Sequence, residues 1–342
     1  MQIFNYPILS INKSYSLNRY FIGLIVIFTL ALSSPEKLNA CDVCGASAQL
    51  GSTSMGFSQS ITRPLIGINF VHWGYQTSAI TNLGNPYTTV DKIQSLNLNY
   101  AQYIHPKIQI QMNWGVNQII RRNAYNENKT ESIMALNDLN FLINYKIIDN
   151  RNQPFQKNKF LWLVGVNSKL PNGHYQIRDL EKRMIPQQLQ PGNGSYSLGL
   201  QSFASWNINN IGVAFQTRIS RPFVNELNYL PGLNGGFQTG LYYLRDFKNK
   251  NNSKTIKLIP QLGLKWDFNQ SDRQYGEIIP TTKMQTGQLF SQVELLTQNM
   301  YAHLFVGIPV HQLSAQNSPV LQPTVRVAVS FILNKKAESE IK

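Results

Sequence analysis

Within residues 106–120 an apolar side chain stands at every second position from Ile108 to Val116. This alternation is the strongest constraint on the fold. Apolar residues take turns with amides or glycine from Ile108 to Asn117: Ile108, Gln109, Ile110, Gln111, Met112, Asn113, Trp114, Gly115, Val116, Asn117. Successive side chains of a β-strand point to opposite faces, so this segment predicts a strand with one apolar and one polar face. A strand that crosses a bilayer at a tilt needs roughly 9–11 residues, whereas about 5–6 is usual in a soluble domain. Length and alternation together favour a membrane-spanning strand.

The same alternation recurs along the chain and predicts about twelve strands. We place them at residues 65–77, 93–104, 107–120, 136–147, 159–169, 195–208, 211–219, 236–247, 256–268, 287–297, 300–310 and 324–333. Lipid cannot form hydrogen bonds with the polar groups of an open strand edge, so the sheet that these strands form must close into a barrel. Charged residues make up only 14% of the chain, against about 25% in a typical soluble domain, which suits an apolar outer belt and a polar, mostly uncharged interior. The predicted fold class is all-β, a transmembrane antiparallel β-barrel.

The connections between these strands alternate in length. Long gaps fall at residues 78–92, 121–135, 170–194, 220–235, 269–286 and 311–323. The intervening gaps include the pairs His105-Pro106, Asn209-Asn210 and Gln298-Asn299. Bacterial outer-membrane barrels have long extracellular loops, short periplasmic turns and an even number of strands. The pattern therefore predicts an outer-membrane barrel with both chain ends in the periplasm, and residues 170–194 and 269–286 as candidate interaction loops.

The N-terminus has the features of an export signal. Lys13 and Arg19 precede an apolar run at residues 20–32, and Ala40 ends a small-residue cleavage site. A transmembrane helix is the alternative, but the run is shorter than the roughly 20 residues that a spanning helix needs. We therefore expect a signal peptide at residues 1–40, a periplasmic segment at 41–64 that could sit in the lumen as a plug, the barrel at 65–333, and a polar tail at 334–342.

Cys41 and Cys44, the two cysteines of the chain, form a C-x-x-C motif directly after this cleavage site. Two thiolates at this spacing can chelate a soft metal ion, which makes copper, as Cu(I), or zinc a candidate ligand. Three readings stay open: metal capture, a disulfide of the kind common in exported proteins, and lipidation of Cys41. A four-ligand site would also need a partner molecule or one of the histidines His72, His105, His174, His303 and His311.

Residues 41–75 resemble the start of a group of Bacteroidota outer-membrane barrel proteins. The likeness rests on the sequence Cys-Asp-Val-Cys-Gly at residues 41–45, on Gly56, and on the run Arg-Pro-Leu-Ile-Gly at residues 63–67 that leads to Tyr75. Members of that group open with a CDxCGC motif and a first strand, and they are labelled as transporters or left uncharacterised. Here Ala46 replaces the third cysteine. The resemblance implies location and architecture and supplies no substrate.

Charged residues on the predicted inner face are candidates for the functional site. They are Lys146, Arg218, Lys265, Asp267, Glu294, His303 and Arg326. Charges that line a pore set its ion selectivity, but the same groups could pair with one another and close a narrow barrel. The formal net charge of +14 favours anionic lipid headgroups, including lipopolysaccharide, or an anionic solute as partners. The basic residues do not gather on one face as nucleic-acid binding would require.

The sequence predicts no enzymatic activity, because it contains no G-x-S-x-G, H-E-x-x-H or phosphate-binding glycine loop. The first functional hypothesis is a channel or transporter for a small solute or metal ion. Two alternatives are kept: a structural or surface-binding outer-membrane barrel, and a soluble exported all-β binding domain.

Overall fold

The computed structural model describes residues 61–80, 86–123, 130–151, 157–178, 190–248, 255–314 and 320–333. The predicted signal peptide, the Cys41–Cys44 motif and the polar tail lie outside these residues, so those expectations stay predictions. Among the described residues no helix is long and apolar enough to span a membrane.

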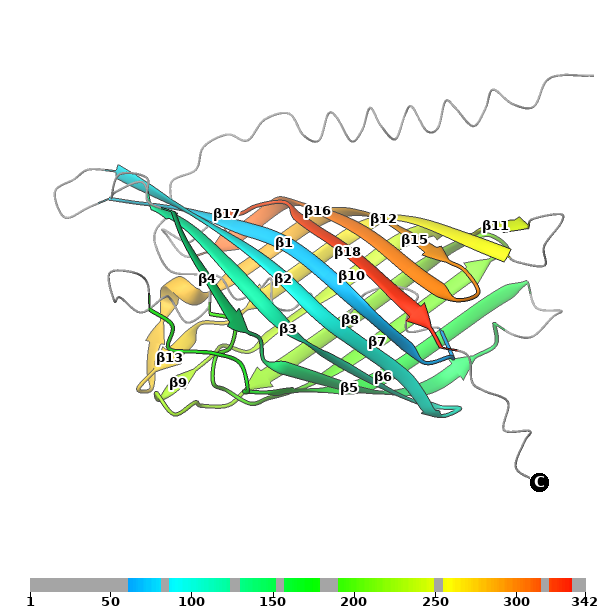
Figure 1. Cartoon of the computed structure of the whole chain (residues 1–342), viewed down its shortest axis with the longest axis horizontal. Helices are drawn as coiled ribbons and strands as arrows, with labels where there is room; N and C mark the ends of the chain where they lie inside the picture. The colour runs from blue at the N-terminus through cyan, green and yellow to red at the C-terminus, as the bar shows by residue number, and fades with distance from the viewer. Residues whose placement is uncertain are drawn as a thin grey trace, which may run out of the picture. The chain divides into compact units, whose positions relative to one another are not determined.

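The described residues form an antiparallel β-barrel (Figure 1). Its main strands are β1 (Leu65–Ile80), β2 (Pro86–His105), β3 (Ile108–Asn123), β5 (Leu139–Asp149), β6 (Asn158–Leu170), β7 (Ser197–Ile208), β8 (Ile211–Pro222), β10 (Asn234–Tyr243), β12 (Thr255–Asn269), β15 (Met284–Leu296), β16 (Met300–Ser314) and β18 (Thr324–Ile332). Each strand pairs with its neighbour along the chain. Pairing of β1 with β18 and of β10 with β12 completes the ring, so no edge is left open.

At three positions of the ring, two consecutive segments together take the place of one strand. β4 (Thr130–Leu136) continues β5 along β3, β11 (Arg245–Lys248) continues β10 along β12, and β17 (Val320–Leu321) continues β18 along β1. Each pair therefore counts once, and the barrel has 12 strand positions. At one break Pro323 has no N–H to give to the ladder. The predicted fold class and strand number are confirmed.

The outward side chains are apolar and exposed. Leu200 is 62% exposed, Leu241 64% and Leu262 56%, and the indole rings of Trp114, Trp162 and Trp206 also lie on this face. A water-soluble protein rarely exposes a continuous apolar surface of this extent. The belt therefore faces lipid, which argues against the soluble binding domain.

The two ends of the barrel differ, although only three of the six predicted long gaps stay long. At one end, where β1 begins and β18 ends, the connections are short (Figure 1). In the β7–β8 turn, Asn209 has φ 55°, in the left-handed region that Asn tolerates and tight hairpins require. The other end carries residues 171–196, 223–233 and 270–283. Here β9 (Tyr229–Leu230), β13 (Asp272–Gln274) and β14 (Glu277–Ile279) form a separate small sheet, followed by the 3₁₀ turn η4 (Pro280–Thr282). We call these the short-turn end and the loop end.

Several strands extend further toward the loop end than the sequence predicts. The β1–β2 connection shrinks to residues 81–85, the β3–β4 connection to 124–129, and β16 runs on to Ser314. Asp91 lies directly opposite Arg121 in the β2–β3 ladder, and their side chains form an ion pair of 2.7 Å. Apolar alternation could not find these extensions, because charged and hydroxyl side chains replace the apolar ones there.

The interior departs from the predicted polar, mostly uncharged lining, because it also contains apolar clusters. One apolar cluster lies toward the loop end: Val71, Trp73, Tyr75, Ile93, Met284 and Leu321. Two more lie toward the short-turn end: Leu161, Leu163, Phe203, Ala214, Tyr242 and Ile259, and Ile61, Leu65, Tyr301 and Ile332. Inner side chains of a barrel this narrow approach one another across the lumen and can form a core. The polar inner residues lie between and beside these clusters.

Candidate functional site: the charged lumen

The structure places all seven predicted lumen residues on inward positions. Lys146 lies on β5, Arg218 on β8, Lys265 and Asp267 on β12, Glu294 on β15, His303 on β16 and Arg326 on β18. Lys146, Glu294 and His303 lie toward the short-turn end of their strands. That these side chains govern passage of a solute stays a prediction.

Arg218, Lys265 and Asp267 form a compact cluster on one wall. Lys265 Nζ lies 2.7 Å from Asp267 Oδ2, and Arg218 is attracted to the same carboxylate. Gly236 on β10 pairs with both Arg218 and Asp267 in the ladder, so no side chain separates them. A Cβ at Gly236 would lie 2.7 Å from Asp267 Oδ1. Glycine is therefore needed there for the carboxylate to lie along the wall.

Arg326 approaches this cluster from another part of the ring. Its strand, β18, is separated from β8 by β10, β12, β15 and β16, yet its guanidinium interacts electrostatically with both Arg218 and Asp267. The Arg326 guanidinium carbon lies 5.6 Å from the centre of the Phe305 ring. Arg218, Lys265, Asp267 and Arg326 are each at most 8% exposed. The charges are thus buried inside the barrel, and we call these four residues the central cluster.

Glu294 and His303 belong to a neighbouring hydrogen-bond network on β12, β15 and β16. Tyr301 Oη donates to Glu294 Oε2 at 2.9 Å, and Gln292 Nε2 donates to Glu294 Oε1 at 3.0 Å and to Gln261 Oε1 at 2.6 Å. His303 Nε2 lies 3.4 Å from Gln292 Oε1. These contacts hold the Glu294 carboxylate in place. Within the described residues, no three His, Cys, Asp or Glu side chains come together as a metal site.

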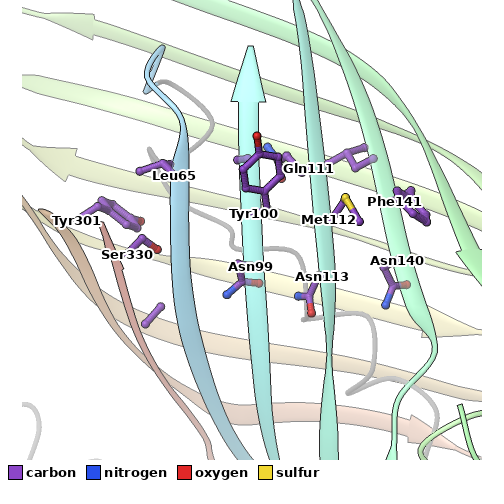
Figure 2. A pocket seen from close by; sticks show the side chains of 13 residues that line it. Leu65, Asn99, Tyr100, Gln111, Met112, Asn113, Asn140, Phe141, Tyr301 and Ser330 are labelled. Carbon is purple, nitrogen blue, oxygen red and sulfur yellow. The ribbon is translucent and has the colours of Figure 1, made fainter. Parts of the chain in front are cut away.

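Amide side chains line the wall formed by β2, β3 and β5. Asn99, Asn113 and Asn140 stand in one row on these strands (Figure 2). They border a cavity of about 40 Å³ that also touches Tyr301 and Ser330. About 10–15 Å³ suffices for one water molecule, so this part of the lumen has room for water.

The short-turn end opens into a larger cavity of about 340 Å³, lined in part by Arg63, Tyr103, His105 and Lys146. Lys146 Nζ lies 4.8 Å from the centre of the Tyr103 ring and 3.2 Å from Asp149 Oδ2. This volume is within the range of small-molecule pockets, about 300–1,000 Å³. It forms an open cavity at the short-turn end of the barrel.

Asp138 anchors the long loop at the opposite end. It lies at the break between β4 and β5 and is 3% exposed. Its carboxylate accepts hydrogen bonds from Lys169 Nζ at 2.8 Å, from the Gly173 N–H at 3.1 Å and from the Asn193 N–H at 3.3 Å. One side chain thus holds both ends of the connection between β6 and β7.

The loops at this end also contact one another. Tyr175 Oη donates to Glu226 Oε2 at 3.0 Å, and this hydrogen bond raises the pKa of the Tyr175 phenol. Ile177 packs against the apolar cluster at the mouth of the barrel. Sequence patterns did not identify these residues, because they lie in segments without alternation. No sequence motif or periodic pattern marks Asp138 as a loop anchor, because it stands next to an apolar run and is followed by Leu139.

Comparison with solved structures supports the architecture. An outer membrane channel from Pseudomonas putida F1 matches with a TM-score of 0.56 and 13% identity, over 80% of this chain and 96% of that one. The transport unit of the autotransporter AIDA-I from Escherichia coli matches at 0.40 with 12% identity, over 84% and 96%. LpxR from Salmonella typhimurium matches at 0.38 with 10% identity, over 79% and 100%. No family model and no curated protein matches the sequence.

At this identity the likeness to the Pseudomonas channel concerns the fold, and the weaker matches add nothing further. The closed ring and the outward apolar belt agree with it. The protein is a 12-stranded antiparallel β-barrel of the outer membrane.

Proposed function

We propose that this barrel is a channel for a small polar solute. The observation that carries the proposal is the polar lining of the lumen, where the central cluster and many amide side chains are buried inside the ring, together with the cavity of about 340 Å³ at the short-turn end. Burying charges costs free energy that a purely structural interior could avoid with apolar side chains. The similar Pseudomonas protein is itself described as an outer membrane channel.

The central cluster also sets an expectation for the size of the pore. Open aqueous porins have about 16–18 strands, so a ring of 12 with charged side chains buried in its lumen should conduct weakly. We expect purified protein in planar bilayers to give discrete single-channel steps, smaller than those of a porin. The control is protein denatured by heat before addition. Absence of steps under all voltages and salts, with correctly folded protein, would overturn the proposal.

A surface-binding barrel is the second candidate, and the loop end favours it. The small sheet of β9, β13 and β14 exposes Tyr275 to 74% and Ile278 to 58%. Exposed aromatic and aliphatic residues on folded loops are typical of a contact surface. Two results together would support this function. The purified barrel would not conduct, and the double variant Tyr275→Ser with Ile278→Ser would weaken adhesion of cells carrying the barrel to a surface or to other cells.

Metal capture by Cys41 and Cys44 is a separate prediction from the sequence. Because these are the two cysteines of the chain, the variant Cys41→Ser with Cys44→Ser removes all thiolate ligands. We expect reduced purified protein to bind Cu(I) tightly and the double variant to lose that binding, as measured by competition with a colorimetric chelator. Equal binding by both proteins would refute the prediction without affecting the channel proposal.

A further inference from the structure

The outer surface of the wall formed by β1, β2 and β3 changes from apolar to polar at one level. These strands lie side by side (Figure 1), and their register aligns the outward side chains in rows. The last wholly apolar row consists of Phe70, Leu96 and Val116. The next row toward the loop end consists of His72, Gln94 and Gln118. The apolar belt of this wall therefore ends between these two rows.

Two exposed cations, Lys92 and Arg122, lie directly beyond the polar row. Lys92 is opposite Ile120 in the β2–β3 ladder, and Arg122 is opposite Val90, so the two cations are diagonal neighbours on the outward face. Long side chains on such neighbours can reach the same group, because their backbones are about 7–8 Å apart. We call five residues the rim patch: His72, Lys92, Gln94, Gln118 and Arg122.

No acidic residue shares the outward face of this wall. Asp91 and Glu131 both lie opposite Arg121, so they belong to the inward face. Among the described side chains of β1, β2 and β3, none at an outward position is acidic. Elsewhere on the ring, the outward Arg221 of β8 stands opposite the apolar Leu198. The rim patch is therefore a local group of cations, whereas Arg221 is isolated on its strand.

Depth along the barrel places the cations of the rim patch at the level of lipid headgroups. On β3 the outward side chains begin with Ile108 and reach the polar row at Gln118. At about 3.3 Å per residue and a strand tilt of about 40°, this distance is roughly 25 Å along the barrel axis, which is the height of the apolar band in outer-membrane barrels. Lys92 lies one row further and Arg122 two rows further. Because long loops mark the extracellular side, these cations face the outer leaflet.

We propose that the rim patch binds lipopolysaccharide of the outer leaflet through the phosphate groups of its lipid A. This inference is independent of the proposed channel function, since it concerns the outer surface of the barrel. Acyl chains pack on the apolar belt, Gln94 and Gln118 lie level with the hydroxyl and amide groups of the sugars, and Lys92 and Arg122 meet the phosphates. Basic residues beside a membrane attract anionic headgroups, and ammonium and guanidinium groups form strong hydrogen bonds with phosphate oxygens.

Native mass spectrometry of the detergent-solubilised barrel tests this assignment, with lipid A that carries two phosphates as the probe. Titration of the lipid gives the apparent dissociation constant of the complex. We expect the wild-type protein to retain the lipid. Lys92→Gln and Arg122→Gln should each weaken binding about fivefold, and the double variant roughly 25-fold, because each basic residue at an anionic lipid surface adds a similar increment of binding free energy.

Matched controls separate the position of the charge from its loss alone. Lys92→Arg keeps the charge in the rim patch and should keep the wild-type affinity for lipid A. Arg221→Gln removes an outward cation of β8, outside the patch, and should change the dissociation constant less than about twofold, since a single exposed charge is largely screened. Heat-modifiable gel migration shows that each variant is folded.

The chemistry of the lipid distinguishes a phosphate site from general adhesion of lipid to the belt. Lipid A without phosphates, with the same acyl chains, should bind the wild-type protein as weakly as the intact lipid binds the double variant. The proposal is overturned if the wild-type protein does not retain lipid A, if the double variant binds it with wild-type affinity, or if the lipid without phosphates binds equally well. Equal retention of phosphatidylglycerol would reveal a site for any anionic headgroup and overturn the assignment to lipopolysaccharide.

Discussion

Leu262→Arg is expected to destabilise the inserted barrel strongly. Leu262 lies midway along β12, is 56% exposed and points outward. If this surface faces the hydrocarbon core of the membrane, an arginine there should cost about 2–4 kcal/mol of folding free energy, the range found near the bilayer midplane. Urea titration of protein folded into lipid vesicles, followed by heat-modifiable gel migration, measures this loss.

Two further variants locate the effect in the bilayer. Leu262→Met keeps the position apolar and should leave the free energy of unfolding almost unchanged. Ile256→Arg places the same charge near the short-turn end of the same strand, where the cost should fall to about 0–1 kcal/mol because the side chain can reach water. Equal losses of unfolding free energy in Leu262→Arg and Ile256→Arg would show that the cost of the charge does not depend on its depth in a bilayer.

Asp138→Ala should release the long loop from the mouth of the barrel. The substitution leaves Lys169 without its carboxylate and removes the acceptor of the Gly173 and Asn193 N–H groups. Removing one partner of a buried ion pair typically costs about 3–5 kcal/mol. We expect a loss near the lower value, since Lys169 keeps a hydrogen bond to the Asn193 side chain.

Limited trypsin digestion of intact cells measures this release, because Lys182 and Arg183 lie in the same connection. Asp138→Ala should be cut much faster than the wild-type protein within residues 171–196. Asp246→Ala is the matched control, since Asp246 lies exposed on β11. Identical digestion of the Asp138 and Asp246 variants would mean that the carboxylate does not hold the loop.

The barrel itself could be predicted from the sequence because lipid imposes a strict rule. Every outward position needs an apolar side chain, so a period of two survives in strands such as β3, β8 and β18. Where a strand leaves the bilayer this rule ends, and Asp91 and Arg121 stabilise the ladder through charge instead. The extended ends of β2 and β3 were therefore missed.

The candidate site could be predicted only in part, for a related physical reason. Alternation assigns Arg218, Asp267 and Arg326 to the inner face, but it carries no information about which strands meet across the lumen. That Arg326 approaches Arg218 depends on ring closure through β10, β12, β15 and β16. The contacts of Asp138 likewise join residues far apart in the chain, with no local pattern to reveal them.

The most direct test of this account is a scan of spin-label accessibility along β12, with single labels at residues 258–268 of a Cys41→Ser, Cys44→Ser protein in lipid vesicles. Collision with oxygen, which concentrates in lipid, should peak at Leu258, Leu262 and Leu264 and fall at Gln261, Lys265 and Asp267. Oxygen accessibility without this two-residue period, or with its maxima at the inner positions, would contradict a barrel whose apolar face lies in the membrane.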